Sequence, residues 1–255
     1  MAAFPLMLPG TSRPPKLVVF DLDHTLIACD ATILWTEFLY EKKIVTDPIW
    51  RQYDRDMVKS YAKGVLDIRD FCRKHAGAFR SIPEEKIHAL AQEFAKKKIA
   101  PLIFPDGKKW AKNALQANIP ACVLSASAAF IVKPIAKLFG LTDAMGIELA
   151  FKDGFCTGEI VGIPTFQEGK VERLSQRLAE AGIGFEDVLF FTDSRNDLPL
   201  AERAGYTVCV NPDAVLESAA RKNGWKVAEW KLSLRTQMTA QVDAKGVPET
   251  QTVRS

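Results

Sequence analysis

Long apolar runs, paired cysteines and a secretion signal are all missing from this sequence. No stretch approaches the ~20 consecutive apolar residues of a membrane-spanning helix. Segment 1–16 has no basic region before its short apolar patch, and prolines interrupt it, so it does not resemble a signal peptide. The scattered cysteines form no Cys-x-x-Cys pair, which predicts reduced thiols in a cytoplasmic protein rather than a disulfide framework or zinc site. They are Cys29, Cys72, Cys122, Cys156 and Cys209.

A strong excess of one charge is missing as well. Lys and Arg number 34 and Asp and Glu number 31, so the net charge is +3. This excess is too small to indicate nucleic acid or an acidic membrane surface as the main partner. Hydrophobic residues make up 47% of the 255 residues and charged residues 25%, as in an ordinary globular protein. The length accommodates a core domain with an inserted accessory domain.

Short β-branched and apolar runs recur along the chain and predict the buried strands of a mostly parallel sheet. They cover residues 16–20, 121–124, 188–191 and 206–210. Helical patterns lie between them, such as the apolar face of Val171, Leu174 and Leu178, and Asn211 with Pro212 indicates the start of another helix. Because strands alternate with helices, the sequence predicts an α/β fold with a Rossmann-like, doubly wound sheet.

Residues 31–100 lack such strand runs and show successive helical patterns, which predicts an all-helical insertion after the first strand. Ser81 and Glu84 form a capping-box pattern for one helix, with Ile87 and Leu90 on its buried face.

The chain divides accordingly. We expect a flexible leader at 1–15, a core domain at 16–30 and 101–230, a helical cap at 31–100 and a loose polar tail at 231–255. Asp153 and Gly154 predict the turn of a hairpin within the core domain.

Two pairs of carboxylates follow two of the predicted strands. Asp21 and Asp23 come directly after the first strand, and Asp193 and Asp197 follow residues 188–191. Ligands of open α/β sheets bind beyond the carboxyl ends of the strands, so these side chains are expected to converge. Converging carboxylates must protonate or bind a cation, and hard oxygens without nearby His or Cys favour Mg²⁺ over zinc. The alternative is that these carboxylates shape turns or cap helices. For Asp21 and Asp23 taken alone, this structural role is slightly favoured over a role in ligand binding.

Two further residues fit a phosphate site. Ser125 ends the run 121–124 and precedes the small-residue turn 126–128, where hydroxyl and backbone N–H groups can hold phosphoryl oxygens. Lys170 stands in the first turn of a predicted helix, where its charge opposes the helix dipole and indicates an anionic partner. Serines in turns and lysines on helices usually have no such role, so both depend on the nearby carboxylates for their interpretation.

The order Asp-x-Asp-x-Thr, Ser, Lys and Asp-x-x-x-Asp resembles the four motifs of the haloacid dehalogenase (HAD) superfamily of phosphohydrolases. The first motif begins at Asp21 and the last at Asp193, and the resemblance covers roughly residues 16–225. The place of the helical insertion is similar to that of subfamily IB members, which carry a helical C1 cap of the phosphoserine-phosphatase type. Thr192 departs from the glycine that many relatives have at this position.

The resemblance implies a role for each motif residue. Asp21 would attack phosphorus, and Asp23 would act first as general acid and then as general base. Asp21, the backbone carbonyl of Asp23 and Asp193 would hold Mg²⁺. Ser125 and Lys170 would bind the phosphoryl oxygens. Supporting residues of the same motifs are Asp197, Asn196 and Thr25.

Asp23 favours a phosphatase, with a phosphomutase as the less favoured alternative, because the dehalogenases and ion-pumping ATPases of the superfamily lack that aspartate. Relatives with this cap act on phosphoserine, histidinol phosphate or other small phosphomonoesters, which implies a small phosphorylated metabolite as the substrate. Open alternatives are a lipid phosphate as substrate and a phosphate-binding regulatory module without turnover.

By spacing, Asp30 and Arg73 match the residues that hold the amino acid in the phosphoserine enzymes, with Arg69 as a neighbouring option. Asp30 also fits the N-cap of a helix that begins near Ala31, and arginines on cap helices are commonly exposed to solvent. Aromatic residues of the insertion fit either a pocket lining or, more commonly, the core of the cap. They include Trp35, Trp50, Tyr53 and Tyr61.

Overall fold

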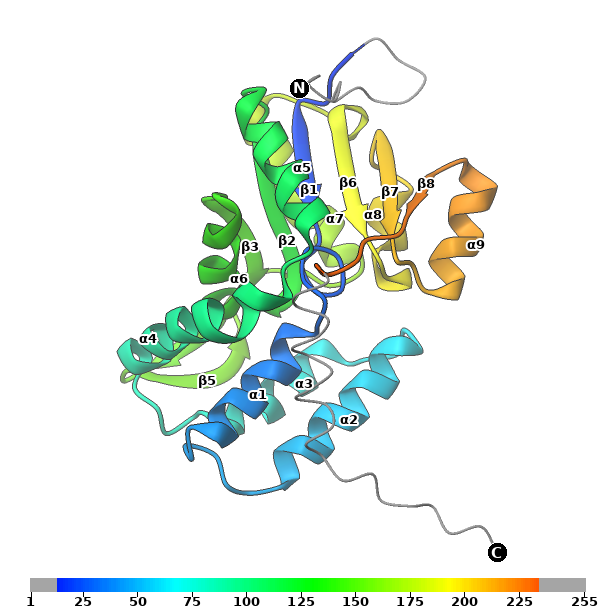
Figure 1. The fold of residues 1–255 in the computed structure, drawn as a ribbon. Coiled ribbons are helices and arrows are strands. Elements are labelled where there is room, and N and C mark those ends of the chain that lie inside the picture. The colour runs from blue at the N-terminus through cyan, green and yellow to red at the C-terminus, as the bar shows by residue number, and fades with distance from the viewer. Residues whose placement is uncertain (1–12, 234–255) are drawn as a thin grey trace, which may run out of the picture.

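A computed structural model describes residues 13–233, so most of the predicted leader and nearly all of the predicted tail lie outside the described residues (Figure 1). The strands are β1 Leu17–Phe20, β2 Ala121–Ala128, β3 Asp143–Ile147, β4 Leu149–Lys152, β5 Phe155–Ile160, β6 Val188–Thr192, β7 Tyr206–Val210 and β8 Lys226–Ala228. The helices are α1 Ala31–Glu41, α2 Ile49–Ala62, α3 Ile68–His75, α4 Glu84–Phe94, α5 Pro105–Gln116, α6 Ala129–Ala136, α7 Glu168–Ala181, α8 Leu198–Ala201 and α9 Ala214–Asn223. None of these helices combines the length and apolar character needed to cross a bilayer.

Within residues 13–233, six strands form one sheet in the order β3-β2-β1-β6-β7-β8, and every neighbouring pair is parallel. Val18 of β1 lies beside Ala121 of β2 and Leu189 of β6. The chain first extends the sheet from β1 to β3 and later returns to the other side of β1 with β6. The predicted doubly wound α/β sheet is therefore confirmed, and its strand order reverses at β1, where ligands of such sheets bind.

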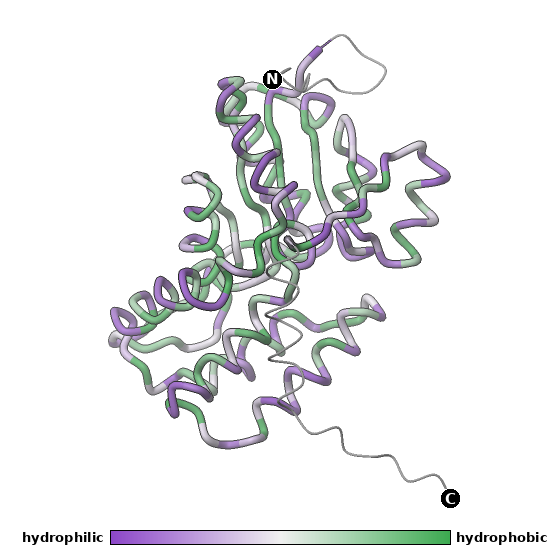
Figure 2. Tube along the Cα trace, in the orientation of Figure 1, coloured by the Kyte–Doolittle hydropathy of each residue, from purple (hydrophilic) through white to green (hydrophobic). Residues whose placement is uncertain are grey.

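Alternate residues of the central strands pack against helices on opposite faces of the sheet. Val18 and Phe20 belong to the larger core on the side of α5 and α6, whereas Leu17 and Val19 pack with Leu174 and other residues of α7 and α8. This follows from the period of two in a strand. Figure 2 shows that the central strands are hydrophobic, whereas the covering helices carry hydrophilic residues as well.

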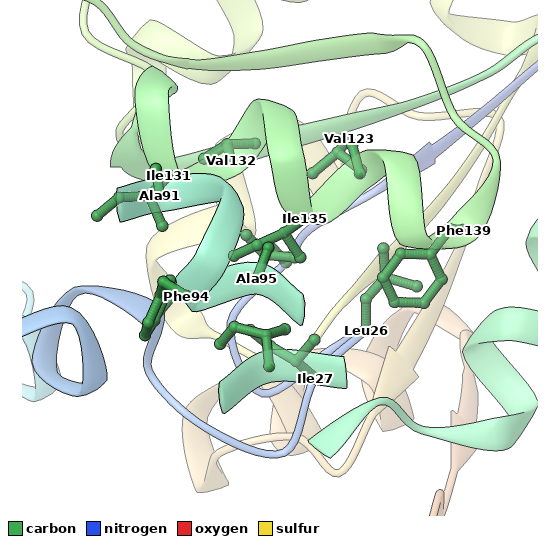
Figure 3. Packing of buried hydrophobic residues seen from close by; sticks show 14 of the residues in the cluster. Leu26, Ile27, Ala91, Phe94, Ala95, Val123, Ile131, Val132, Ile135 and Phe139 are labelled. Atoms are coloured by element: carbon green, nitrogen blue, oxygen red, sulfur yellow. The ribbon is translucent and has the colours of Figure 1, made fainter. Parts of the chain in front are cut away.

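The larger core extends from the sheet to α4. Ala91 and Phe94 of α4 lie near Ile131 and Ile135 of α6 in one buried apolar cluster (Figure 3). Trp35 of α1 meets the Phe94 ring edge-on, with 5.5 Å between the ring centroids. Helix α4 therefore shares its apolar face with the sheet domain, although it lies in the segment predicted as the cap.

Two antiparallel segments connect helices α1–α3 to the sheet. Ala28 N donates to Leu102 O at 2.8 Å, and Phe104 N donates to Leu26 O at 3.0 Å. The chain therefore leaves the sheet domain and returns to it side by side. These paired connections hold α1–α3 beyond the carboxyl end of β1 (Figure 1).

Strands β4 and β5 form the hairpin predicted at Asp153 and Gly154, and β5 packs against α3. A Cβ atom built on Gly158 of β5 would lie 2.8 Å from the Cα of Arg73 and 2.9 Å from the carbonyl oxygen of Cys72. Gly158 also has a φ of +82°, which side chains of L-residues rarely adopt. Only glycine fits this contact without a shift of the backbone.

The sequence patterns predict β1, β2, β6 and β7 but miss the short edge strands β3 and β8. Two predicted helix starts are wrong. Helix α4 follows Pro83 without a side-chain cap, so Ser81 does not form a capping box. Helix α9 is capped by Asp213, whereas the Asn211 side chain bonds the backbone of Trp230 instead.

A buried polar cluster joins the three cap helices through Thr36, Asp54 and His75. Thr36 Oγ1 and His75 Nε2 are 3.0 Å apart, and Asp54 Oδ1 lies 3.7 Å from that nitrogen. Within the described part of the chain, neither oxygen of Asp54 has a hydrogen-bond partner. Burial raises the pKa of Asp54 to about 7 and lowers the pKa of His75 to about 4. The cluster therefore favours neutral side chains.

We expect Gly158→Ala to lower the free energy of unfolding by about 1–3 kcal/mol more than Gly154→Ala does. Gly154 has a similar φ of +80°, but no other atom lies within 4 Å of its Cβ position, so only the backbone strain is shared. Urea unfolding of both variants measures the difference. An equal loss of unfolding free energy in the two variants would contradict the close contact between β5 and α3.

We expect Asp54→Asn to raise the Tm at about pH 8.5 by more than it does at about pH 5.5. The folded-state pKa of about 7 exceeds the ordinary value of 3.8, so the stability from this carboxyl is fully present below pH 3.8 and is lost as the pH rises from there through 7. A gain of about 1 kcal/mol corresponds to roughly 2–4 °C. Thermal unfolding checks this, with the exposed Asp56→Asn of the same helix as control. A gain independent of pH would contradict it.

Candidate active site

The loop after β1 places Asp21 and Asp23 at the carboxyl end of the sheet. Asp21 N donates to Phe191 O at 2.9 Å, so the pairing of β1 with β6 continues one residue beyond β1. The carbonyl of Leu22 then accepts hydrogen bonds from the amides of residues 25–27. This turn ends the strand and closes a tight loop around the two carboxylates.

Lys170 is a buried cation between two carboxylates. Its Nζ lies 2.6 Å from Asp21 Oδ1 and 2.8 Å from Asp197 Oδ2, and only 1% of its side chain is exposed. Thr192 Oγ1 donates to the same oxygen of Asp197 at 2.7 Å. Buried charges persist only when each has a partner. The start of α7 and the end of β6 are therefore both tied to Asp21.

One buried cation lies among three carboxylates, of which Asp21 and Asp197 are buried and Asp193 is partly buried. Burial raises the pKa of Asp21 to about 7, although Lys170 acts in the opposite direction. Burial and the charges of Asp21 and Asp197 raise the pKa of Asp193 well above its ordinary value. Burial lowers the pKa of Lys170, but Asp197 and Asp21 outweigh this effect and hold its pKa above the ordinary value. The site therefore carries an excess of negative charge that a second cation would relieve.

Both carboxylate oxygens of Asp23 are held. Oδ1 accepts a hydrogen bond from Ala31 N at 2.6 Å, and Oδ2 accepts from Ser127 Oγ at 2.8 Å and Ser125 Oγ at 3.2 Å. Burial, followed by the charge of Asp30, raises the pKa of Asp23 to about 6. A carboxyl group with a pKa near neutrality suits a group that both donates and accepts a proton.

Asp193 and Asn196 are fixed by neighbours from other loops. Thr25 Oγ1 donates to Asp193 Oδ1 at 2.9 Å, which joins the first and last motifs. Asp213 N donates to Asp193 O at 2.9 Å, so the loop after β7 supports the same segment. Asn196 is buried and donates to Tyr61 O of α2 at 3.0 Å. The structure therefore brings together all the predicted core residues of the site.

The donor set suits a hard divalent cation. Among residues 13–233, no three His, Cys, Asp or Glu side chains are arranged to hold a metal by themselves. Mg²⁺ needs fewer side chains, because it keeps several waters and binds through one or two carboxylates. The carboxylates of Asp21 and Asp193, with the carbonyl of Asp23, are the ligands expected from the sequence, and the excess negative charge would favour a bound cation.

A cavity of about 490 Å³ lies between the cap and this site. Asp21, Asp23 and Asp193 line it on the side of the sheet. Tyr61 lines it as well, whereas Trp35 is fully buried in the core. The cap supplies mainly apolar lining residues, including Ile33, Leu34, Met57, Leu66, Ile68 and Phe71. Carboxylates therefore line the cavity on the side of the sheet, and mainly apolar side chains line it on the side of the cap.

Of the three residues expected to hold the substrate, Asp30 alone lines the cavity. It also caps α1 by accepting a hydrogen bond from Ile33 N at 3.0 Å. Arg73 instead lies 4.0 Å from Glu159 of the hairpin and is half exposed, and Arg69 is exposed. The structure does not bring either arginine to the cavity.

A second contact joins the cap to the motif loops. Gln167 Nε2 donates to Gly64 O at 3.2 Å, just beyond α2, and to Asn196 Oδ1 at 3.1 Å. The sequence does not predict the role of Gln167. A polar residue before a helix gives no local signal for a contact with Gly64, which is 103 residues away in the chain.

Comparison with known proteins places this chain in a family. The family model of haloacid dehalogenase-like hydrolases matches residues 18–202. A histidinol-phosphatase of Neisseria meningitidis serogroup C is 35% identical over 220 residues, which cover 85% of this chain and 99% of that protein. The crystal structure of a protein of unknown function from Bordetella pertussis Tohama I is 31% identical, with a TM-score of 0.75 over 83% of this chain and 96% of that one. A substrate-bound phosphoserine phosphatase shares the fold, with a TM-score of 0.64 at 21% identity over 90% of this chain and 99% of that one.

The chain belongs to the haloacid dehalogenase-like hydrolase family. Both the family and the fold expected from the sequence are confirmed. The expected enzyme class, a phosphoric monoester hydrolase, is confirmed with them.

We expect Lys170→Met to lower the free energy of unfolding by about 3–5 kcal/mol near pH 8, because it leaves Asp21 and Asp197 buried without a counter-charge. The loss should be smaller near pH 5.5, since the raised pKa of Asp21 lets it protonate there. Urea unfolding at both pH values measures this. Lys133→Met is the control, because Lys133 pairs with Glu148 at 2.7 Å but is 52% exposed, and should cost less than about 1 kcal/mol. Similar losses in the two variants would contradict the expectation.

Proposed function

We propose that this protein is a Mg²⁺-dependent phosphatase that transfers phosphate from a small phosphomonoester to Asp21 and then to water. The observation that carries the proposal is the setting of Asp21. Its carboxylate is held 2.6 Å from the buried Lys170, beside Asp23, and it lines the cavity. A desolvated carboxylate oriented by a cation suits nucleophilic attack on phosphorus.

The proposed reaction uses Asp21 and Asp23 in turn. The carboxylate of Asp21 attacks phosphorus, and the bond from phosphorus to the alcohol oxygen breaks. Asp23 donates a proton to that oxygen, and it then takes a proton from the water that hydrolyses the aspartyl-phosphate. The raised pKa of Asp23, about 6, suits both transfers.

Positioning and charge support these steps. Ser125 and Lys170 are proposed to hold phosphoryl oxygens, and the raised pKa of Lys170 keeps it cationic. Asp197 holds the lysine in place. Bound Mg²⁺, held by Asp21, the carbonyl of Asp23 and Asp193, would offset the repulsion between phosphate and nucleophile.

The cavity favours histidinol phosphate over phosphoserine as the substrate. Its described lining includes Asp30 and Glu37 but no Lys or Arg. Arg51 already pairs with Glu37 at 2.7 Å, which leaves Asp30 to face an ammonium group. A carboxylate would find no Lys or Arg in this lining, where His24 is the basic side chain, whereas an imidazole ring can pack against Phe71. The name of the 35% identical relative agrees with this choice.

The free cysteines support a reducing, cytoplasmic location as part of the proposal. Four of the five are buried, and only Cys29 is partly exposed.

We expect Mg²⁺-dependent release of inorganic phosphate, abolished by EDTA, with a kcat/KM for histidinol phosphate at least about 10-fold above that for phosphoserine. The assay panel should also contain sugar phosphates, nucleotides, a lysophosphatidate and p-nitrophenyl phosphate. Asp21→Asn should abolish turnover and keep the thermal unfolding transition, because the amide cannot act as the nucleophile.

Arg73→Ala and Arg69→Ala serve as controls for this panel, and they should leave kcat/KM unchanged because neither arginine lines the cavity. A preference for phosphoserine that is lost in either variant would overturn the choice of substrate. A preference for lysophosphatidate would indicate a lipid substrate. Normal turnover by Asp21→Asn, or Mg²⁺ binding without any phosphate release, would overturn the phosphatase proposal.

A further inference from the structure

We propose that Ser127 and Thr32 are positioning residues that orient Asp23 and make its orientation depend on the docking of the cap. The inference rests on the proposed function, in which Asp23 protonates the leaving oxygen. Ser127 lies at the end of β2, and Thr32 lies in the first turn of α1. Their hydroxyls meet at 3.0 Å across the boundary between sheet and cap.

The carboxylate of Asp23 can only accept, and this determines the direction of the hydrogen bonds among Thr32, Ser127 and Asp23. The Ser127 hydroxyl donates to Asp23 Oδ2 at 2.8 Å, so its oxygen is left to accept from Thr32. The chain therefore runs from Thr32 to Ser127 to Asp23. Each donor polarises the next one, which strengthens the contact to the carboxylate because both hydroxyl residues are buried.

Both residues are buried, with 5% of Ser127 and 8% of Thr32 exposed. The register of β2 is irregular between Leu124 and Ala128, but the hydroxyls of Ser125 and Ser127 both donate to Asp23 Oδ2 and therefore lie on the same side. Ser127 N also donates to Ser125 Oγ at 3.0 Å. The end of β2 thus presents two hydroxyls to Asp23, and the nearer one is that of Ser127.

The same turn of α1 holds the other oxygen of Asp23. Ala31 N donates to Asp23 Oδ1 at 2.6 Å, and Thr32 reaches Oδ2 through Ser127. Both oxygens are therefore tied, directly or through one hydroxyl, to the first turn of the cap. A movement of α1 away from the sheet would break the contact of Ala31 N with Oδ1 and that of Thr32 with Ser127, and the two serine hydroxyls of β2 would then hold Oδ2 alone.

The consequence depends on the leaving group. An alkoxide needs a proton as it departs, whereas p-nitrophenolate departs without one. Loss of the hydroxyl pair should therefore slow phosphoryl transfer from alkyl esters far more than from p-nitrophenyl phosphate. The value of kcat/KM reports this step, because it covers the reaction only up to the departure of the first product.

The experiment compares Ser127→Ala and Thr32→Val with the wild type on histidinol phosphate and p-nitrophenyl phosphate. We expect kcat/KM for the alkyl ester to fall about 10–100-fold in Ser127→Ala and less in Thr32→Val, with less than about 3-fold change for the aryl ester. The double variant should be no worse than Ser127→Ala, since the two hydroxyls act in one chain. Thr32→Ser should restore the wild-type value.

Thr36→Val is the matched control. Thr36 is a fully buried threonine one turn further along α1, and its hydroxyl meets Thr32 O and His75 rather than Asp23. Thr36→Val should change kcat/KM for the alkyl ester and for the aryl ester by the same factor. Ser127→Ala keeps the backbone amide that bonds Ser125, and thermal unfolding of every variant reports on folding.

Equal losses on the two esters in Ser127→Ala, or no loss on either, would overturn the inference and leave the phosphatase proposal standing. A wild type that hydrolyses neither ester nor any other member of the panel would overturn both. A selective loss in Thr36→Val as large as in Ser127→Ala would also contradict the specific role of the hydroxyl pair.

Discussion

The buried contact of Lys170 with Asp21 and Asp197 is the interaction on which the rest of this site depends. Each charge is desolvated, so removal of the lysine would leave both carboxylates without a counter-charge. The lysine can be buried only because Leu174 and Leu178 of the same helix pack against the sheet. Apolar packing of α7 therefore determines where the ammonium group lies, and the ammonium group determines where the nucleophile lies.

The cap completes the site at two places. The first turn of α1 holds Asp23 through Ala31, and the C-terminal end of α2 meets Asn196 and Gln167 through backbone carbonyls. At both places the cap contacts a loop of the sheet domain that carries motif residues. The cap consequently closes the cavity and contacts the groups that are proposed to react there, as expected of a lid that assembles a site as it closes.

The sequence predicted the buried central strands because each is a continuous apolar run, as a strand covered on both faces requires. It missed β3 and β8, since short edge strands lack that pattern. The helix starts assigned to Ser81 and Asn211 failed because local capping signals compete with tertiary contacts, and Asn211 bonds Trp230 instead. The distant arginines Arg69 and Arg73 were matched by spacing alone, and helix geometry turned them away from the cavity.

By itself the sequence determined the class of fold, the family and the convergence of Asp21, Asp23 and Asp193, because strand order and the ends of parallel strands place these residues at one edge. Tertiary structure alone decided the partners of each charge, the apolar and acidic lining of the cavity and the hydroxyl contact from cap to sheet. These features depend on side chains far apart in the chain, such as Thr32 and Ser127. Their meeting is determined by packing between helices and sheet, and no local pattern encodes it.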